Sequence, residues 1–330
     1  MRRREFIALL GGAAAWPSAA SAQQAERIRR IGVLMPLSAT DPEGKAEIAA
    51  FVDQLEKRGW TNGGNLSIDL RWAAGNRERM EALAKELTAS QPDVIFCRST
   101  PATASLLKQT RSIPIVFAVV SDPVGEGFVA SLARPGGNAT GFTNAESSLT
   151  GKWLGLLKEV TPSANRIAFI FDPKIAPGGG VYYTQLIETA APSFAVIPTA
   201  IPVHNPADIE SAIDEFARQP NGGLIVLPGA TTNLNRQLII TLAARYRMPA
   251  VYAFRYFAAE GGLMSYGVNV AELFRSAADY ADRILRGAKP ADLPVQLPEK
   301  FEFVINLKTA RTLDLTMPPG VLAIADETIE

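Results

Sequence analysis

The sequence predicts an α/β protein of two doubly wound lobes, each built on a parallel sheet and joined by a hinge. Short apolar runs alternate with segments of helical periodicity, and the alternation starts afresh near the middle of the chain. Strands that alternate with amphipathic helices are typical of parallel sheets covered by helices on both faces. With 330 residues, the chain is long enough for two such domains.

In the first lobe, apolar runs and helical spacing predict strands and helices in alternation. The helix expected over 44–58 places Ile48, Phe51 and Leu55 at helical spacing and stops at Gly59. The expected strands span 29–36, 66–72, 92–96, 113–120 and 139–142, and the expected helices span 44–58, 78–89, 102–110 and 128–133.

The pattern then begins again in the second half of the chain. We place the hinge near 142–148, with a Pro-rich crossing segment at 287–294. The predicted first lobe comprises 27–143 and 268–292, and the second comprises 144–267 and 293–330. The expected strands are 166–171, 194–201, 223–228, 249–252, 262–267 and 301–306; the expected helices are 149–160, 181–190, 207–217, 232–245 and 270–285, with a short helix and tail at the end.

The N-terminal residues 1–22 have the features of an export signal. Three arginines at 2–4 precede an apolar stretch and the small residues before Ala22, which predicts cleavage after Ala22. The segment 3–7 also looks like a twin-arginine motif, so we expect a periplasmic protein. The next residue is Gln23 rather than Cys, so a lipid anchor is not indicated, and an N-terminal tail is the alternative interpretation.

Charge and residue counts argue against several function classes. Lys plus Arg equal Asp plus Glu at 33 each, which gives no support for nucleic-acid binding. Cys97 is the sole cysteine and His204 the sole histidine, which excludes an intramolecular disulfide and a His/Cys metal site. A Ser-His-Asp or Cys-His catalytic system would have to use His204. We expect Cys97 to pack as a small apolar residue and His204 to lie on the surface or to cap a helix. The sequence therefore predicts no enzyme, no metal and no cofactor.

Polar and aromatic side chains follow the predicted strands at their carboxyl ends. In doubly wound sheets these ends point the same way, so both lobes can present them to one cleft. After the strand 92–96, we expect Thr100 to cap the next helix, whose amides suit a carboxylate. The candidate ligand-binding residues are Ser38, Thr40, Ser99, Thr100, Ala102, Ser121, Asp122, Asn144, Asp172, Gly179, Tyr182, Gly229, Tyr252, Phe254 and Tyr266.

Several of these assignments have a structural alternative. Asp122 could accept an ammonium group or form a turn before Pro123. Phe254 and the three tyrosines of the set could stack on a ligand or lie at the edge of the core. Arg255 could bind a ligand carboxylate, although pairing with Glu260 is the interpretation we favour. The glycines at 178–180 could contact ligand or form a flexible loop.

Several motifs together resemble one family over nearly the whole chain after the export signal. They are 114–117 (PIVF), 121–125 (SDPVG), 132–141 (LARPGGNATG), 261–267 (GGLMSYG), 284–294 (ILRGAKPADLP) and 304–310 (VINLKTA). The chain resembles the ABC-transporter substrate-binding protein family that includes TrpX-like aromatic-amino-acid binders. The resemblance implies a type I periplasmic binding protein with two Rossmann-like lobes, a ligand closed between them, and a membrane permease and its ATPase as partners.

From these observations we expect the solute-binding protein of an ABC importer. Its ligand would be a small carboxylate, either an amino acid or an aromatic or short organic acid, captured by closure of the lobes. One alternative is a sensing protein that feeds a membrane receptor. Another is a periplasmic enzyme on the same scaffold that uses Asp122 or Asp172.

Overall fold

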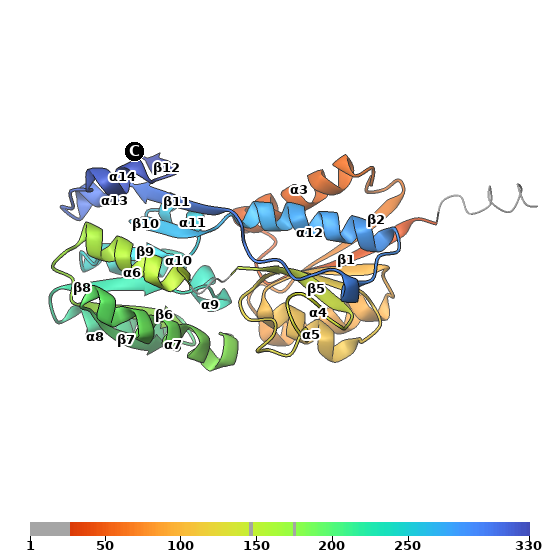
Figure 1. Ribbon diagram of the computed structural model, residues 1–330, viewed down its shortest axis with the longest axis horizontal. Coiled ribbons are helices and arrows are strands. Elements are labelled where there is room, and N and C mark those ends of the chain that lie inside the picture. The colour runs from red at the N-terminus through yellow and green to blue at the C-terminus, as the bar shows by residue number, and fades with distance from the viewer. Residues whose placement is uncertain (1–26, 145–147, 174–175) are drawn as a thin grey trace, which may run out of the picture.

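The described residues form two lobes side by side, each built around one β-sheet (Figure 1). The structure is a computed structural model and describes residues 27–144, 148–173 and 176–330. The sheet of the first lobe has the strand order β2-β1-β3-β4-β5, and that of the second has β12-β11-β10-β9-β8-β6-β7. The predicted export signal at 1–22 lies outside the described residues.

The first lobe is a parallel sheet with helices on both faces. Helices α3 and α12 cover one face, while α4 and α5 cover the other (Figure 1). Phe96 of the sheet stacks on Phe51 of α3 at 4.3 Å between ring centroids, and the edge of Phe274 from α12 packs against it at 4.9 Å. The elements are β1 (Arg29–Met35), α3 (Pro42–Lys57), β2 (Leu66–Trp72), α4 (Arg77–Ala89), β3 (Val94–Arg98), α5 (Thr100–Gln109), β4 (Ile115–Val120), β5 (Ala139–Thr143) and α12 (Val270–Leu285).

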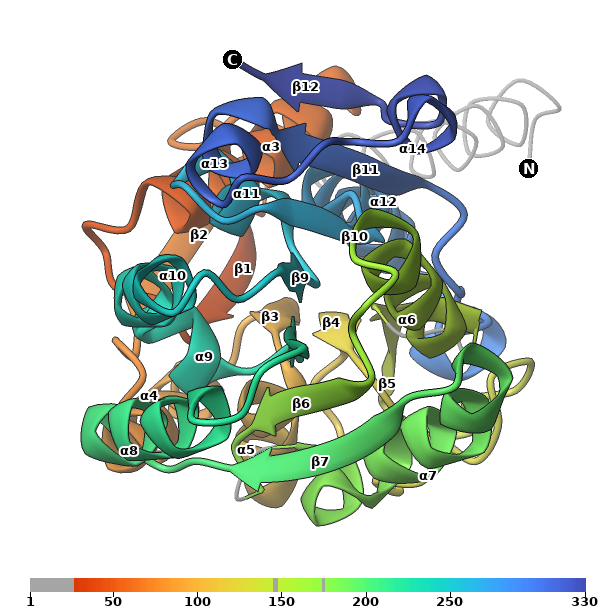
Figure 2. The same ribbon diagram turned by 90° about the vertical axis from the view of Figure 1, so that its left-hand side faces the viewer.

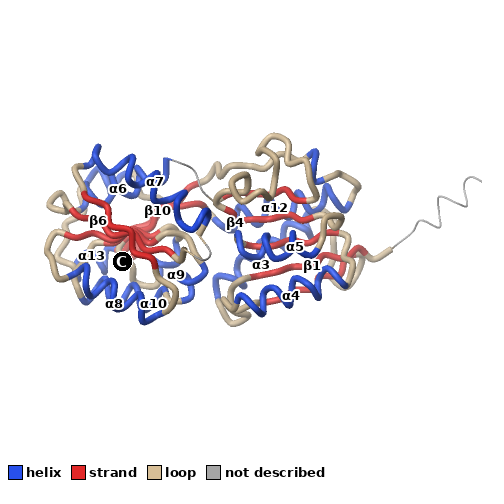
Figure 3. Tube along the Cα trace, turned by 90° about the horizontal axis from the view of Figure 1, so that it is seen from below, coloured by secondary structure: helices blue, strands red, loops and turns tan. Residues whose placement is uncertain are grey.

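The second lobe has helices α6 and α7 on one side of its sheet and α8 and α10 on the other (Figures 2 and 3). Its strands are parallel except that β11 runs antiparallel to β10. Its elements are α6 (Ser148–Val160), β6 (Arg166–Phe171), η1 (Pro177–Gly180), α7 (Val181–Ala190), η2 (Ala191–Phe194), β7 (Ile197–Pro202), α8 (Pro206–Ala217), β8 (Gly222–Val226), α9 (Ala230–Leu234), α10 (Arg236–Arg245), β9 (Ala250–Tyr252), α11 (Arg255–Ala259), β10 (Met264–Val268), β11 (Phe301–Asn306), α13 (Leu307–Thr312), α14 (Pro319–Ala323) and β12 (Glu327–Ile329).

Three segments carry the chain between the lobes. They follow β5, follow β10, and run from η3 (Pro290–Asp292) to β11. The third is hydrogen-bonded to the end of β5, because Gln296 N donates to Gly141 O at 2.9 Å and Thr143 N donates to Gln296 O at 3.0 Å. Asn269 N donates to Lys300 O at 3.2 Å and so joins the second to the third. The lobe boundaries predicted at 143/144, 267/268 and 292/293 stay predictions.

The structure explains why residue 141, the last position of the 132–141 motif, is a glycine. Its φ of +155° lies outside the range that other residues usually adopt, and a Cβ there would approach Phe117 O to 2.0 Å. Strands β4 and β5 can therefore pair at this point only because residue 141 has no side chain.

Two helix predictions are wrong. The expected helix at 128–133 is replaced by turns, in which Phe128 N and Val129 N both donate to Pro123 O and Ala130 N donates to Pro135 O. These bonds reach carbonyls five or six residues away along the chain, and none follows the i to i−4 pattern of an α-helix. The expected helix at 232–245 is divided into α9 and α10 at Asn235, whose ψ of 21° departs from helical geometry.

Every helix within the described ranges is too short or too polar to cross a lipid bilayer.

Candidate functional site

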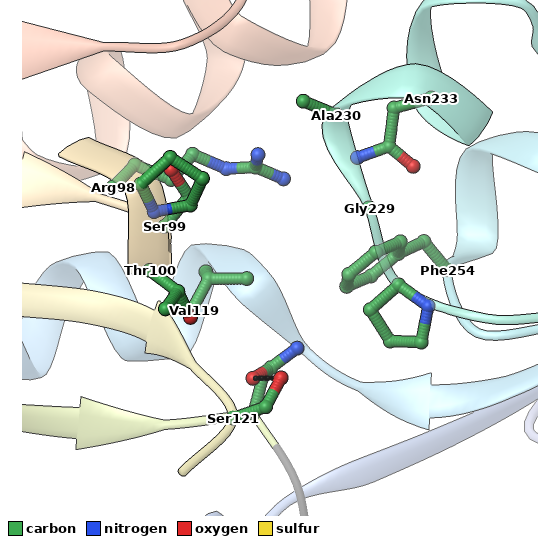
Figure 4. A pocket seen from close by; sticks show the side chains of 12 residues that line it. Arg98, Ser99, Thr100, Val119, Ser121, Gly229, Ala230, Asn233 and Phe254 are labelled. Atoms are coloured by element: carbon green, nitrogen blue, oxygen red, sulfur yellow. Dashed lines mark hydrogen bonds between the residues drawn. The ribbon is translucent and has the colours of Figure 1, made fainter. Parts of the chain in front are cut away.

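A small pocket lies between the two lobes, where the carboxyl ends of strands from both sheets face each other (Figure 4). The first lobe contributes residues that end or follow β3, β4 and β5, and the second contributes the turns after β8 and β9. The cavity holds about 40 Å³. It is lined by Arg98, Ser99, Thr100, Pro101, Val119, Ser121, Asn144, Pro228, Gly229, Ala230, Asn233 and Phe254.

Six of the residues predicted from the sequence line this pocket, from five different strand ends. Ser121 and Asn144 are joined by a hydrogen bond of 3.0 Å, in which the serine hydroxyl donates to the amide oxygen. The other four are Ser99, Thr100, Gly229 and Phe254.

The other predicted residues of the first lobe lie outside the pocket. Ser38 and Thr40 are hydrogen-bonded to each other at 2.9 Å in a solvent-facing loop. Ala102 is fully buried inside α5. The carboxylate of Asp122 accepts a hydrogen bond of 2.8 Å from Gly125 N, and it thereby closes the turn after β4.

The other predicted residues of the second lobe also lie outside the pocket. Asp172 is buried and accepts a hydrogen bond of 2.5 Å from the Thr231 hydroxyl. Gly179 lies exposed in η1 with a φ of +68°. The three tyrosines each contact another aromatic ring: Tyr182 with Tyr183, Tyr252 with Phe257, and Tyr266 with Phe301.

The turn before α5 corrects the predicted cap. Helix α5 begins at Thr100, and the N-cap position belongs to Ser99, whose side chain makes no capping hydrogen bond. Ser99 has a φ of +87° and Val119, on the facing strand, has a φ of +58°. Such values are costly for residues other than glycine, and above all for a β-branched residue. The register of β4 with β5 also shifts between Ala118 and Val120, a bulge that lies beside the pocket.

Arg98 is the pocket residue that sequence reasoning missed. It ends the otherwise apolar strand β3, and only 2% of its side chain is exposed. Its Nε lies 2.9 Å from Glu47 Oε2 of α3, and 4% of the Glu47 side chain is exposed. The two groups form an ion pair without a well-aligned hydrogen bond, and Arg98 Nη2 has no hydrogen-bond partner among the described residues. A charged residue within an apolar run was the available signal.

Burial has a strong effect on the acidic partner of Arg98. Desolvation raises the pKa of Glu47 to about 7, even though the positive charge of Arg98 acts to lower it. The guanidinium also lies over the ring of Phe254, with Arg98 Cζ 5.9 Å from the ring centroid. The pocket therefore contains a buried cation whose charge is only partly matched by the protein.

A second arginine joins the lobes at the edge of the cleft. Arg236 Nη1 of α10 donates to Asp41 Oδ2 of the first lobe at 2.9 Å. Its Nε donates to both carboxylate oxygens of Glu260 at 2.7 and 2.9 Å. The Ser121 and Tyr183 hydroxyls form a further contact between the lobes at 2.7 Å. The bond from Arg236 to Asp41 and the contact between Ser121 and Tyr183 join the lobes in a closed arrangement.

The predicted pairing of Arg255 with Glu260 is wrong. Arg255 instead donates three hydrogen bonds of 2.6 to 2.9 Å to Glu327 of β12. Glu260 is taken by Arg236, which approaches from α10. Strand β12 is distant in sequence but packs close to Arg255, and this packing decides that Arg255 pairs with Glu327 rather than with Glu260.

Cys97 and His204, the two side chains that a nucleophilic catalytic system would need, lie outside the pocket. Cys97 is fully buried with its Sγ 3.4 Å from the Thr103 hydroxyl, and burial raises the pKa of its thiol to about 12. His204 lies in an exposed loop before α8. Across the described ranges, no three His, Cys, Asp or Glu side chains come together as metal ligands would.

Comparison with known proteins gives consistent matches. Residues 30–329 match the family described as ABC transporter substrate binding protein. A tyrosine-binding protein of Clostridioides difficile is 27% identical over 269 residues, covering 80% of this chain and 75% of that protein. A conserved domain protein of Vibrio cholerae is 28% identical with a TM-score of 0.85, over 92% of this chain and all of that one.

A further solved structure, the ABC domain of a Streptococcus pneumoniae protein in complex with L-Trp, is 24% identical with a TM-score of 0.85 over the same shares of the two chains. The two-lobed α/β architecture is that of the type I periplasmic binding proteins. The family is described by substrate binding, and the Clostridioides difficile relative is named a tyrosine-binding protein. Because the family match spans nearly all of the described residues, the chain belongs to the ABC transporter substrate-binding protein family.

Proposed function

We propose that this protein is the solute-binding component of an ABC importer, and that it captures a small carboxylate between its lobes in the periplasm. The observation that carries the proposal is Arg98, a buried cation in a pocket walled by both lobes. The described relatives support it, since one is named a tyrosine-binding protein and another holds L-Trp.

A carboxylate fits the first-lobe wall of the pocket chemically. Arg98 Nη2 and Ser99 Oγ have no hydrogen-bond partners within the described residues, and both are donors. The N-terminus of the ten-residue helix α5 adds positive partial charge to the same wall. An anion placed there would complete hydrogen bonds that the protein alone leaves unmade.

Closure of the lobes would couple capture to delivery. A ligand that contacts Arg98 on one lobe and the Gly229 turn on the other binds the closed form better than the open one. The closed form would then present both lobes together to the permease and its ATPase. Export through the N-terminal segment, with cleavage after Ala22, would place the protein where this delivery occurs.

A binding screen tests this function. The protein is expressed with its own N-terminal segment, purified from the periplasmic fraction and screened by thermal shift against carboxylates, sugars and nucleosides. A ligand that binds the folded state raises the melting temperature. We expect shifts with carboxylates and recovery of each ligand chemically unchanged; shifts with sugars or nucleosides alone would refute the carboxylate assignment.

A further inference from the structure

We propose that the closed cleft selects a short zwitterion: a carboxylate and an ammonium group close together, with a side chain smaller than a phenyl ring. The inference rests on the proposed function and narrows the ligand of that same site. On this proposal the ligand is not an aromatic amino acid. The proposal depends on the size of the cavity, its aromatic lining and its unpartnered polar atoms.

The cavity is too small for an aromatic side chain in the closed arrangement. It holds about 40 Å³, whereas a cavity that binds benzene measures about 150 Å³. The hydrogen bond of 2.9 Å from Arg236 to Asp41 joins the two walls across the cleft in this arrangement. A glycine, alanine or serine side chain asks for much less room than a phenyl or indole ring.

The pocket also lacks an open surface on which a ring could stack. Phe254 is the sole aromatic side chain among the described lining residues. Its ring already lies under the Arg98 guanidinium and stacks with Tyr256 at 5.4 Å between centroids. The tyrosines that sequence reasoning assigned to stacking contact Tyr183, Phe257 and Phe301 instead, away from the pocket.

The unpartnered polar atoms include both a hydrogen-bond donor and a hydrogen-bond acceptor. Arg98 Nη2 is a buried donor, and Asn233 Oδ1 is a buried acceptor; neither has a partner among the described residues. The two side chains extend into the gap from opposite lobes (Figure 4). Only 3% of Asn233 is exposed, so water does not replace a missing donor easily.

A zwitterion satisfies both atoms at once. Its carboxylate accepts from Arg98 and from the Ser99 hydroxyl, and its ammonium group donates to Asn233 Oδ1. A carboxylate without an ammonium group leaves the Asn233 oxygen unpaired in the closed cleft. The site therefore discriminates by the ammonium group as well as by side-chain size.

Calorimetric titration with matched probes tests both halves of the proposal. The protein is first unfolded and refolded to remove retained ligand, and each probe is titrated into it. The short set is glycine, L-alanine and L-serine; propionate differs from L-alanine by the ammonium group, L-phenylalanine by the phenyl ring, and D-ribose carries neither charge. We expect a member of the short set to bind at least about tenfold more tightly than propionate and L-phenylalanine.

Each of the other possible results overturns one part of the proposal. L-Phenylalanine binding as tightly as the short set removes the size selection but leaves the carboxylate function standing. Propionate equal to L-alanine removes the role of the ammonium group. Silence toward the whole short set refutes the zwitterion, and binding of D-ribose alone refutes the proposed function itself.

Two substitutions locate the selection in the pocket. Asn233→Leu removes the acceptor at similar size, so the preference for L-alanine over propionate should fall by about tenfold while propionate still binds. Asn165→Leu, at an exposed asparagine outside the pocket, should keep that preference. Phe254→Leu makes room, so L-phenylalanine should gain relative to L-alanine; unchanged ratios in both pocket variants contradict the proposal.

Discussion

Two arginines lie along the cleft between the lobes, and their surroundings differ. Arg236 donates to Asp41, to Glu260 and to the Asn233 carbonyl, and 14% of its side chain is exposed. Arg98 is 2% exposed and has one acidic neighbour, to which it makes no well-aligned hydrogen bond. The protein supplies hydrogen-bond partners for the guanidinium of Arg236 but leaves the guanidinium of Arg98 without a full set.

We propose that this difference reflects two roles, with Arg236 holding the lobes together and Arg98 binding a ligand. A buried donor without a partner costs about 1–3 kcal/mol, more when it is charged, so a ligand that accepts a hydrogen bond from Arg98 would stabilise the closed form. The hydrogen bonds of Arg236 need nothing further. We therefore expect substitutions at Arg98 to affect binding first, and those at Arg236 to affect the opening of the lobes.

The largest expected effect is from Arg98→Met. It removes the counter-charge that lowers the pKa of Glu47, so this carboxyl holds a proton at neutral pH and is left buried without a partner; the free energy of unfolding should fall by about 1–3 kcal/mol. Carboxylate binding should be lost as well. Urea denaturation and calorimetry measure the two effects.

The double variant Arg98→Met with Glu47→Leu is the matched control. It removes both charges together, so most of the stability should return while binding stays lost. Recovery of binding in the double variant would show that Arg98 acts only through the fold.

The pH dependence of stability sharpens the comparison next. The folded pKa of Glu47 is raised from 4.5 to about 7, so the folded state holds its proton more tightly than the unfolded one. Stability should therefore be greatest below about pH 4.5 for this group and decline by at most about 3 kcal/mol as pH rises to about 7. Urea denaturation from pH 4.5 to 8 measures it, and Glu47→Gln should reduce the slope.

Glu302 provides the control for that measurement. Burial raises its pKa to about 7 too, so it contributes a slope of the same sign from β11, outside the pocket. Glu302→Gln should reduce the stability slope without altering the pH dependence of ligand binding, while Glu47→Gln should alter both. Equal effects of the two variants on binding would argue against a specific role for the pair in the cleft.

Arg236→Met should have a moderate effect on lobe closure. Loss of the bond to Asp41, which spans the lobes, favours the open form, so ligand affinity should fall about tenfold because closing the lobes then costs more. Small-angle scattering of the ligand-free protein should show a larger radius of gyration. Arg247→Met, in an exposed pair with Asp314 at 68% and 72% exposure, should change neither quantity.

The smallest effect is expected from Tyr183→Phe. It removes one hydroxyl contact between the lobes, the bond to Ser121, and leaves the packing of the ring intact. Affinity should fall by less than about tenfold, since a neutral hydrogen bond contributes about 1 kcal/mol. A loss as large as that of Arg98→Met would mean that Ser121 and Tyr183 belong to the binding site itself.

Segments with strong local patterns could be predicted closely. The helices expected over 181–190 and 270–285 and the strands over 166–171 and 301–306 match α7, α12, β6 and β11 residue for residue. Helix α12, for example, begins at an asparagine cap and keeps one apolar face along its length. The helix expected at 128–133 is wrong because its backbone N–H groups bond to the carbonyls of Pro123 and Pro135 in local turns.

The sequence by itself determined the alternation of strands and helices, the balance of charge and the strand ends at which polar residues gather, because each depends on neighbours along the chain. Only the tertiary structure decided which of those residues meet. In the folded protein Arg98 is buried against Glu47, the tyrosines pack against other aromatic rings, and Arg255 pairs with Glu327. These outcomes depend on contacts between segments far apart in sequence, and on the bulge and positive φ angles beside the pocket, which no local pattern encodes.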